Sequence, residues 1–158
     1  MDGKIFFVTK DKFKELKKEY EHLVEFERTK TTGQEAPKIL ESEDLNPEFI
    51  SYQEDMSSLR GRIDELQNII ENHQIIRRPA KERQQFVDLG AKVQLETNGK
   101  KNEFVIVGTL EANPELGKIS NESPVGRALL GKQIGEEIKV PEHENIKYKL
   151  KGISYELS

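Results

Sequence analysis

Six carboxylates gather between Ile39 and Leu59, a stretch without a single lysine or arginine. They are Glu41, Glu43, Asp44, Glu48, Glu54 and Asp55. Carboxylates held close together without a neutralising base repel one another, so they gain by sharing a divalent cation or by meeting a positively charged partner. This acidic segment is therefore the first place in the chain to expect a function.

A long helical pattern follows the acidic segment. Its inward-facing residues recur at alternating steps of three and four, which is the seam of a coiled coil. They are Phe49, Tyr52, Met56, Leu59, Ile63, Leu66, Ile70 and His73. Asn46 suits an N-cap and Pro47 the first helical position. The pattern predicts a helix from Pro47 to Ile76, about 45 Å long at about 1.5 Å per residue.

A shorter helical pattern precedes the acidic segment. Thr9 can cap it, and its apolar residues Phe13, Leu16, Tyr20 and Leu23 keep the same alternating steps. The pattern weakens beyond Arg28, and Pro37 predicts an interruption near residues 31–37, followed by a short segment at residues 38–41. Two matching seams predict an antiparallel coiled-coil hairpin that carries the acidic segment at its tip.

After residue 79 the period changes from helix to strand. Val87 to Leu95 alternate apolar and polar residues, and Asn98-Gly99 is typical of a tight hairpin turn. Further strands are predicted at residues 104–107, 137–140 and 146–154, and a short helix at 124–130. The chain is thus predicted to be α+β, with a coiled-coil hairpin over residues 1–80 and a small antiparallel-sheet domain over residues 81–158. Residues 81–85 would be the linker.

Composition narrows the class further. Hydrophobic and charged residues each make up 34% of the chain, which suits an elongated shape, and the absence of cysteine excludes disulfides and thiolate metal sites. No apolar run approaches the roughly 20 residues of a membrane span, so a cytoplasmic protein without membrane contact is expected. Residues 1–78 carry 13 basic and 17 acidic residues, with the bases gathered away from the predicted tip. Without a continuous basic face, strong autonomous DNA binding is not expected.

One segment is similar to a known signature. Residues 119–132 read Ile-Ser-Asn-Glu-Ser-Pro-Val-Gly-Arg-Ala-Leu-Leu-Gly-Lys, and Gly135-Glu136-Glu137-Ile138 follows. This segment resembles the carboxy-terminal domain of the Gre (GreA/GreB) family of bacterial transcript cleavage factors. Asn46-Pro47-Glu48-Phe49 and Gly61-Arg62-Ile63 resemble the coiled-coil part of the same family. The resemblance implies an FK506-binding-protein-like (FKBP-like) fold from about residue 82 to residue 158.

The resemblance also implies a transcription elongation factor that is not an enzyme by itself. Such factors bind bacterial RNA polymerase, insert their coiled coil into its secondary channel and stimulate the polymerase's own cleavage of backtracked RNA at the 3′ end. The tip carboxylates help to hold a Mg²⁺ ion that is shared with the polymerase active site, and no cofactor of the factor's own is implied. Carboxylate oxygens suit a weakly bound second metal ion and its water.

The tip departs from the family pattern, in which two acids commonly lie three positions apart. Counting from Thr9 places the first acid at Glu43, whereas counting back from Asn46 places it at Ser42. The second acid then falls on Leu45 or Asn46. Glu43 and Asp44 can act as an adjacent pair, with Glu41 close by. We therefore predict Glu43, Asp44 and Glu41 as the catalytic acids, and Glu43 and Asp44 as metal ligands only together with polymerase. A secondary-channel regulator that docks without stimulating cleavage stays an open alternative.

Two other groups of residues are candidates. In the family, the loop that corresponds to Asn121, Glu122, Ser123 and Pro124 contacts a coiled coil at the rim of the polymerase channel. The alternative is a helix start, with the serine as cap and the proline at the first position. Arg60 and Arg62 could neutralise RNA phosphates along the hairpin, although an ordinary solvated helix face is equally open.

Other chemistries find little support in the sequence. His22, His73 and His143 lack the spacing of metal ligands. An FKBP-like sheet could suggest a prolyl isomerase, but the chain has no tryptophan and few aromatic residues with which to line an apolar peptide pocket.

Overall fold

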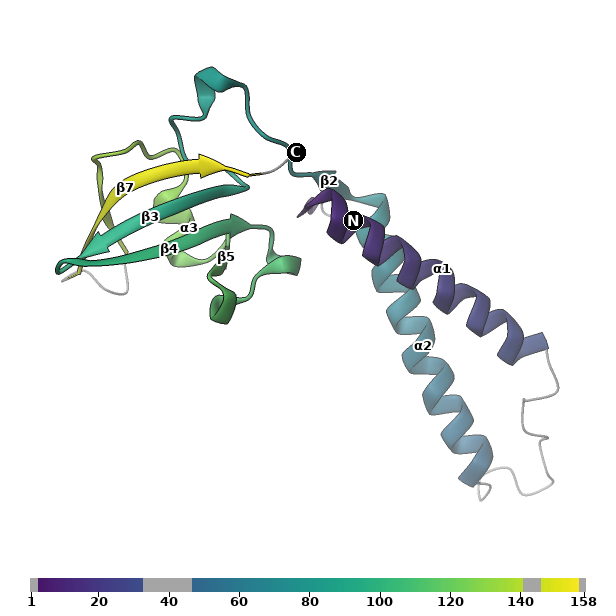
Figure 1. The fold of residues 1–158 in the computed structure, drawn as a ribbon. Coiled ribbons are helices and arrows are strands. Elements are labelled where there is room, and N and C mark those ends of the chain that lie inside the picture. The colour runs from purple at the N-terminus through teal and green to yellow at the C-terminus, as the bar shows by residue number, and fades with distance from the viewer. Residues whose placement is uncertain (1–2, 33–46, 141–145, 157–158) are drawn as a thin grey trace. The chain divides into compact units, whose positions relative to one another are not determined.

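The computed structural model describes residues 3–32, 47–140 and 146–156 (Figure 1). The chain divides into two compact units. Residues 11–72 form a helical hairpin unit, and residues 1–10 together with 73–158 form a sheet unit. The fold class is α+β, as predicted. Within the described residues, no helix is both long enough and apolar enough to cross a membrane.

The hairpin unit contains helix α1 (Lys10–Thr32) and helix α2 (Pro47–Glu71). The predicted seam is confirmed at Leu16, Met56, Ile63 and Leu66, which are all buried, but near its end the buried residue is Ile69 and the predicted Ile70 is only half-buried. Helix α2 begins at Pro47 as predicted. The hydroxyl of Tyr52, near the start of α2, donates to the carbonyl of Lys30, near the end of α1, at 3.2 Å, so the helices run antiparallel.

The predicted ends of both helices need correction. Helix α1 continues beyond Arg28 to Thr32, where the hydroxyl of Thr31 bonds back to the carbonyl of Glu27 at 3.0 Å. The remainder of the predicted interruption lies outside the described residues. Helix α2 ends at Glu71 rather than Ile76, because residues 73–75 form a strand instead. His73 is therefore not a seam residue.

That strand, β2 (His73–Ile75), pairs in parallel with β1 (Phe6–Val8), and neither was predicted. The backbone N–H of Ile76 also donates to the carbonyl of Val8 at 2.8 Å. The two strands are far apart in sequence, so no local pattern indicates their pairing. Their backbone hydrogen bonds override the helical period of residues 73–75. The pairing also places both segments in the sheet unit, whereas the predicted division lay near residue 80.

The sheet unit contains a five-stranded sheet with the order β5-β4-β3-β7-β6. Its elements are β3 (Ala91–Thr97), β4 (Lys100–Val107), β5 (Lys118–Ser120), helix α3 (Pro124–Leu129), β6 (Glu137–Lys139) and β7 (Lys147–Tyr155). The Asn98-Gly99 turn is confirmed, with positive φ at both residues. The sheet is antiparallel except at β5, an unpredicted strand that runs parallel to β4. The described part of the unit also contains three short 3-10 helices, Lys81–Arg83, Thr109–Glu111 and Pro114–Leu116.

One face of this sheet carries the core. Val93, Leu95, Ile106 and Leu150 are at most 1% exposed and pack with Leu129 of α3. The first predicted strand residue, Val87, is buried in the same core although β3 begins only at Ala91. The segment after β5 runs directly into α3, so the core fixes the position of residues 121–124.

Candidate functional site

The acidic tip itself cannot be placed. Glu41, Glu43 and Asp44 lie outside the described residues, so their predicted roles remain predictions. On the described part of α2, Glu48 lies in the first turn. Within the described residues, no group of three or more histidine, aspartate or glutamate side chains could hold a metal ion.

Arg60 and Arg62 join the two helices of the hairpin. Arg62 forms a two-point ion pair with Glu19, with Nε–Oε1 at 2.7 Å and Nη2–Oε2 at 2.9 Å. It also contacts Glu65 at 3.1 Å. The hydrogen bond from Arg62 lowers the pKa of the Glu19 carboxyl, and the same bond raises the pKa of Arg62. Arg60 pairs with Glu27 at 3.0 Å. Both guanidinium groups are thus engaged in holding the hairpin together, and contact with RNA phosphates stays a prediction.

The loop at residues 120–124 is a rigid helix start. Ser123 is the N-cap of α3, and its hydroxyl oxygen accepts from the N–H of Gly126 at 3.1 Å. The same hydroxyl donates to the carbonyl of Ser120 at 2.7 Å. A side chain on Gly126 would overlap that carbonyl, so glycine allows α3 to lie against the end of β5. The capping role predicted as an alternative for Ser123 is confirmed, with Pro124 at the first turn.

The same loop presents a carboxylate to solvent in a fixed position. The hydroxyl of Thr109 donates to Glu122 Oε2 at 2.9 Å and lies 3.2 Å from the hydroxyl oxygen of Ser120. The backbone N–H of Asn121 donates to the carbonyl of Val107 at 2.9 Å. Glu122 and Pro124 are both exposed. An exposed acid and proline on an anchored backbone can recognise a basic or apolar partner surface with little loss of entropy on binding.

Sequence reasoning missed the contribution of Thr109. It lies in a 3-10 helix 13 residues before Glu122, and no periodicity or motif connects the two positions. Only the pairing of β5 with β4 brings them together.

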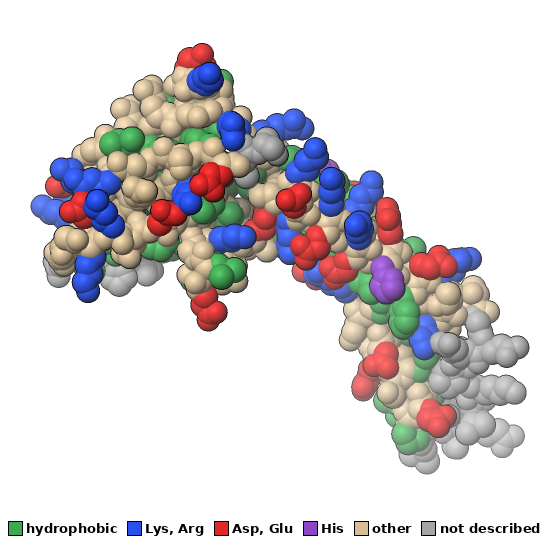
Figure 2. Space-filling model, in the orientation of Figure 1, with side chains coloured by type: hydrophobic (Ala, Val, Ile, Leu, Met, Phe, Trp, Pro, Cys, Tyr) green, Lys and Arg blue, Asp and Glu red, His purple; other side chains and the backbone are tan. Residues whose placement is uncertain are grey.

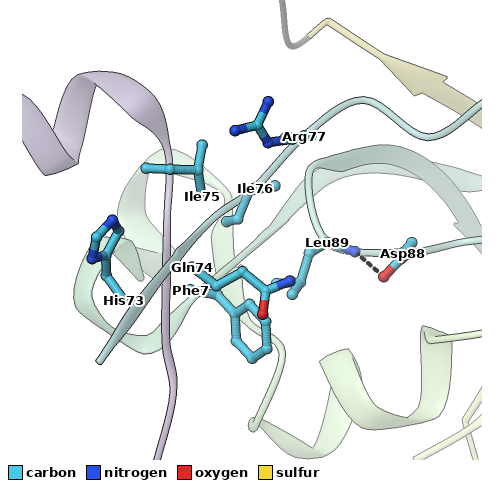
Figure 3. Close-up of a pocket in the computed structure, with 8 residues that line it drawn as sticks. All are labelled: Phe7, His73, Gln74, Ile75, Ile76, Arg77, Asp88 and Leu89. Atoms are coloured by element: carbon cyan, nitrogen blue, oxygen red, sulfur yellow. Dashed lines mark hydrogen bonds between the residues drawn. The ribbon is translucent and has the colours of Figure 1, made fainter. Parts of the chain in front are cut away.

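The sheet unit also contains an open pocket of about 570 Å³ that the sequence did not indicate (Figure 3). Its lining combines four apolar residues with four polar or charged ones: Phe7, Ile75, Ile76, Leu89, His73, Gln74, Arg77 and Asp88. The Asp88 carboxylate accepts from the N–H of Leu89 at 2.7 Å and thereby fixes the turn before β3. The lining includes no serine, threonine or lysine nucleophile, and the pocket offers no catalytic arrangement.

Comparison with known proteins settles the family. A family model described as "Transcription elongation factor, N-terminal" matches residues 6–75, and one described as "Transcription elongation factor, GreA/GreB, C-term" matches residues 82–155. The chain belongs to the GreA/GreB family of transcription elongation factors. The resemblance seen in the sequence is therefore confirmed for both parts of the chain.

Two individual relatives of this GreA/GreB family member agree with the assignment. Transcription elongation factor GreA of Clostridium acetobutylicum is 35% identical over 155 residues, covering 95% of this chain and 97% of the relative. GreA of Thermomicrobium roseum is 34% identical over 135 residues, covering 84% of this chain and 86% of the relative. Among solved structures, a prokaryotic transcription elongation factor GreA/GreB from Nitrosomonas europaea aligns with a TM-score of 0.43 at 18% identity, covering 95% of this chain and 99% of that one.

Proposed function

We propose that this GreA/GreB family member binds bacterial RNA polymerase in the cytoplasm and inserts its helical hairpin into the secondary channel. There it stimulates the polymerase's own cleavage of backtracked RNA. The observation that carries the proposal is that one chain matches both family models, over residues 6–75 and 82–155. The chain is then an accessory factor, and the polymerase supplies the active site.

The hairpin is suited to deliver side chains at a distance. Helix α2 has 25 residues, which corresponds to about 37 Å at about 1.5 Å per residue. The buried seam and the Arg62–Glu19 and Arg60–Glu27 ion pairs join its two helices. A hairpin stiffened in this way can carry a charged tip into a channel without folding back, which keeps the loss of conformational entropy on binding small.

Glu43 and Asp44, with Glu41 nearby, would supply the chemistry at the tip. Carboxylate oxygens are the donors that Mg²⁺ prefers, so the donor set fits the ion. A Mg²⁺ ion held between the tip and the polymerase would orient and activate a water molecule for phosphodiester hydrolysis. In the sheet unit, the loop at residues 121–124 would provide the docking contact, because its backbone is anchored and Glu122 and Pro124 are exposed.

A cleavage assay tests the proposal. Polymerase paused in a backtracked complex with labelled RNA receives the purified chain and Mg²⁺. We expect the RNA to be shortened from its 3′ end, whereas the chain alone should cut nothing and polymerase alone should cut slowly. Transcripts that stay at full length over a range of Mg²⁺ concentrations would contradict the proposal.

A regulator that docks without stimulating cleavage is the second candidate. It is favoured by one observation, namely that counting through the tip from either flank places the family's second acid on Leu45 or Asn46, neither of which is acidic. In the same assay this regulator would slow nucleotide addition and leave the backtracked RNA intact.

A further inference from the structure

We propose that the solvent face of the sheet carries a contact site for the phosphate backbone of double-stranded DNA, formed by Lys101, Lys139, Lys147 and Lys149. These four residues are called the lysine face below. The site is separate from the hairpin, from the loop at residues 121–124 and from the cleavage chemistry.

The strand register places the four lysines on one face. Lys101 of β4 lies opposite Glu96 of β3, and Glu96 lies opposite Lys149 of β7. Directly opposed residues in a sheet point to the same side, and so do residues two apart along a strand. Lys147 is therefore on the same face, as is Lys139 of β6, which lies opposite it. The buried residues Leu95, Ile138 and Leu150 occupy the alternating positions and point to the core.

The charges of this face are not balanced. Ion pairs join Lys92 to Glu103 and Glu156, and Lys151 to Glu96. Among the described residues, none of the four members of the lysine face takes part in an ion pair, and all four are exposed. Around them, Lys92 and Lys151 add positive charges and Glu96, Glu103, Glu137 and Glu156 add negative ones, which leaves a net charge of +2 among the described residues of this face. Figure 2 shows basic side chains gathered, with acidic ones among them, at the end of the sheet where the β3–β4 turn lies.

The direct opposition of Lys139 and Lys147 argues for an anionic ligand. Like charges facing each other across two strands lie about 5 Å apart at Cβ and destabilise the pairing. Protection of an edge strand accounts for a lysine on β6, which is the last strand of the sheet. It does not account for Lys147, which faces Lys139 from β7, a strand that lies inside the sheet between β3 and β6. Lys149 differs, because Glu96 and Glu137 lie opposite it on either side. A bound phosphate would relieve this repulsion.

The composition and width of the lysine face favour duplex DNA over a protein. Protein interfaces are depleted in lysine and centre on aromatic, methionine or arginine anchors, whereas the described residues of this solvent face are mainly lysine and glutamate and include no such anchor. Phosphate backbones are bound through just such flexible point charges. The face runs over four neighbouring strands, β4-β3-β7-β6, or about 14 Å at about 4.8 Å per spacing. That width is close to the roughly 12 Å of a major groove, so phosphates of both DNA strands can be reached.

The test compares two variants with the same charge change in the full-length chain. One replaces all four residues of the lysine face by glutamine. The control replaces four exposed lysines of α1, namely Lys10, Lys14, Lys17 and Lys18, by glutamine. Binding of a fluorescent 20-base-pair duplex is followed by anisotropy at salt concentrations from about 20 to about 150 mM. Contacts with the phosphate backbone are strongest at the low end of this range.

We expect the lysine-face variant to bind the duplex at least about tenfold more weakly at the lowest salt. Its plot of log affinity against log salt should lose up to about 3.6 units of slope, at about 0.9 for each of the four phosphate contacts. The control should stay within about twofold of wild type, and arginine at the four lysine-face positions should preserve binding, because arginine keeps the charge.

Three results would overturn the proposal. The wild-type chain could fail to bind the duplex at the lowest salt, or both variants could lose binding equally, which would reveal an effect of net charge alone. Alternatively, the lysine-face variant could keep its DNA affinity and lose affinity for polymerase, which would make the face a protein-docking surface. Circular dichroism of each variant verifies that the sheet is folded.

Discussion

Arg62 makes its strongest contact with Glu19 on the facing helix, and this pair has a pH signature. Because Arg62 lowers the pKa of the Glu19 carboxyl, the charged pair stabilises the folded hairpin. A carboxyl with a lowered folded-state pKa contributes fully above its unfolded pKa, near 4.5, and the contribution is lost as the pH falls through the folded value.

We expect Glu19→Gln to lower the free energy of unfolding of the hairpin at pH 7 by about 0.5 to 1 kcal/mol, since the pair is partly exposed to solvent. The difference from wild type should shrink as the pH is lowered from 5 to 3. Thermal unfolding, followed by circular dichroism at each pH, measures this difference in stability. Glu21→Gln is the matched control, because Glu21 is exposed on the same helix. A deficit that is independent of pH would show that packing, rather than charge, is the contribution of Glu19.

The tip acids can be tested at the same scale. Glu43→Gln and Asp44→Asn keep the shape of the side chains and remove the charge that a Mg²⁺ ligand needs. Each should reduce polymerase-dependent RNA cleavage by tenfold or more, which is about 1.4 kcal/mol or more in the barrier, with unchanged polymerase binding. Higher Mg²⁺ should partly restore the rate.

Glu54→Gln and Asp55→Asn are the controls for that series, because both residues lie exposed on α2, beyond the tip, and should affect cleavage little. If the double variant Glu43→Gln, Asp44→Asn cleaves at the full rate, the ligands must be Glu41 or Glu48, or the tip acts by its shape.

At the scale of elements, the position of α3 depends on a single glycine. A Cβ on Gly126 would overlap the carbonyl oxygen of Ser120, which is backbone and cannot move aside as a side chain could. We expect Gly126→Ala to destabilise the sheet unit by about 1 to 3 kcal/mol, the usual cost of forcing extra atoms into a packed site. Denaturant unfolding followed by circular dichroism measures the change.

Gly61 offers a matched control within helix α2. A Cβ there meets nothing within 4 Å, so Gly61→Ala should stabilise the hairpin by about 0.5 to 1 kcal/mol through helix propensity. If Gly126→Ala is as stable as wild type, the contact between α3 and β5 is softer than the packing indicates.

At the scale of the whole molecule, docking and chemistry should be separable. Glu122→Gln keeps the hydrogen bond from Thr109 but removes the charge, and Pro124→Ala removes an exposed ring at the first turn of α3. The double variant should bind polymerase more weakly and therefore cleave less at low concentration. At saturating concentration the cleavage rate should return to the wild-type value, because only occupancy was lost.

Glu115→Gln is the control, since Glu115 is exposed in a 3-10 helix of the same unit. A cleavage defect that persists at saturation, with the sheet unit folded, would assign the loop a role other than docking.

The sequence by itself determined the elements that depend on local order. The alternating steps of three and four predicted the buried seam of α1 and α2, Pro47 marked the start of α2, and Asn98-Gly99 marked the hairpin turn. Each of these signals acts over a few residues, through side-chain period, a missing N–H or tolerance of positive φ. The family signature over residues 119–132 likewise lies within one continuous segment, and the family model that matches residues 82–155 confirmed it.

Only the tertiary structure decided the features that join distant segments. Residues 73–75 continue the helical period of α2 but form β2, because β1, which precedes α1 in the chain, offers them backbone hydrogen bonds. The strand β5, the bond from Thr109 to Glu122, the Arg62–Glu19 pair and the common face of four lysines depend on pairings that no local pattern encodes. Local propensity differs between conformations by fractions of a kcal/mol per residue, so a few backbone hydrogen bonds and buried side chains are enough to override it.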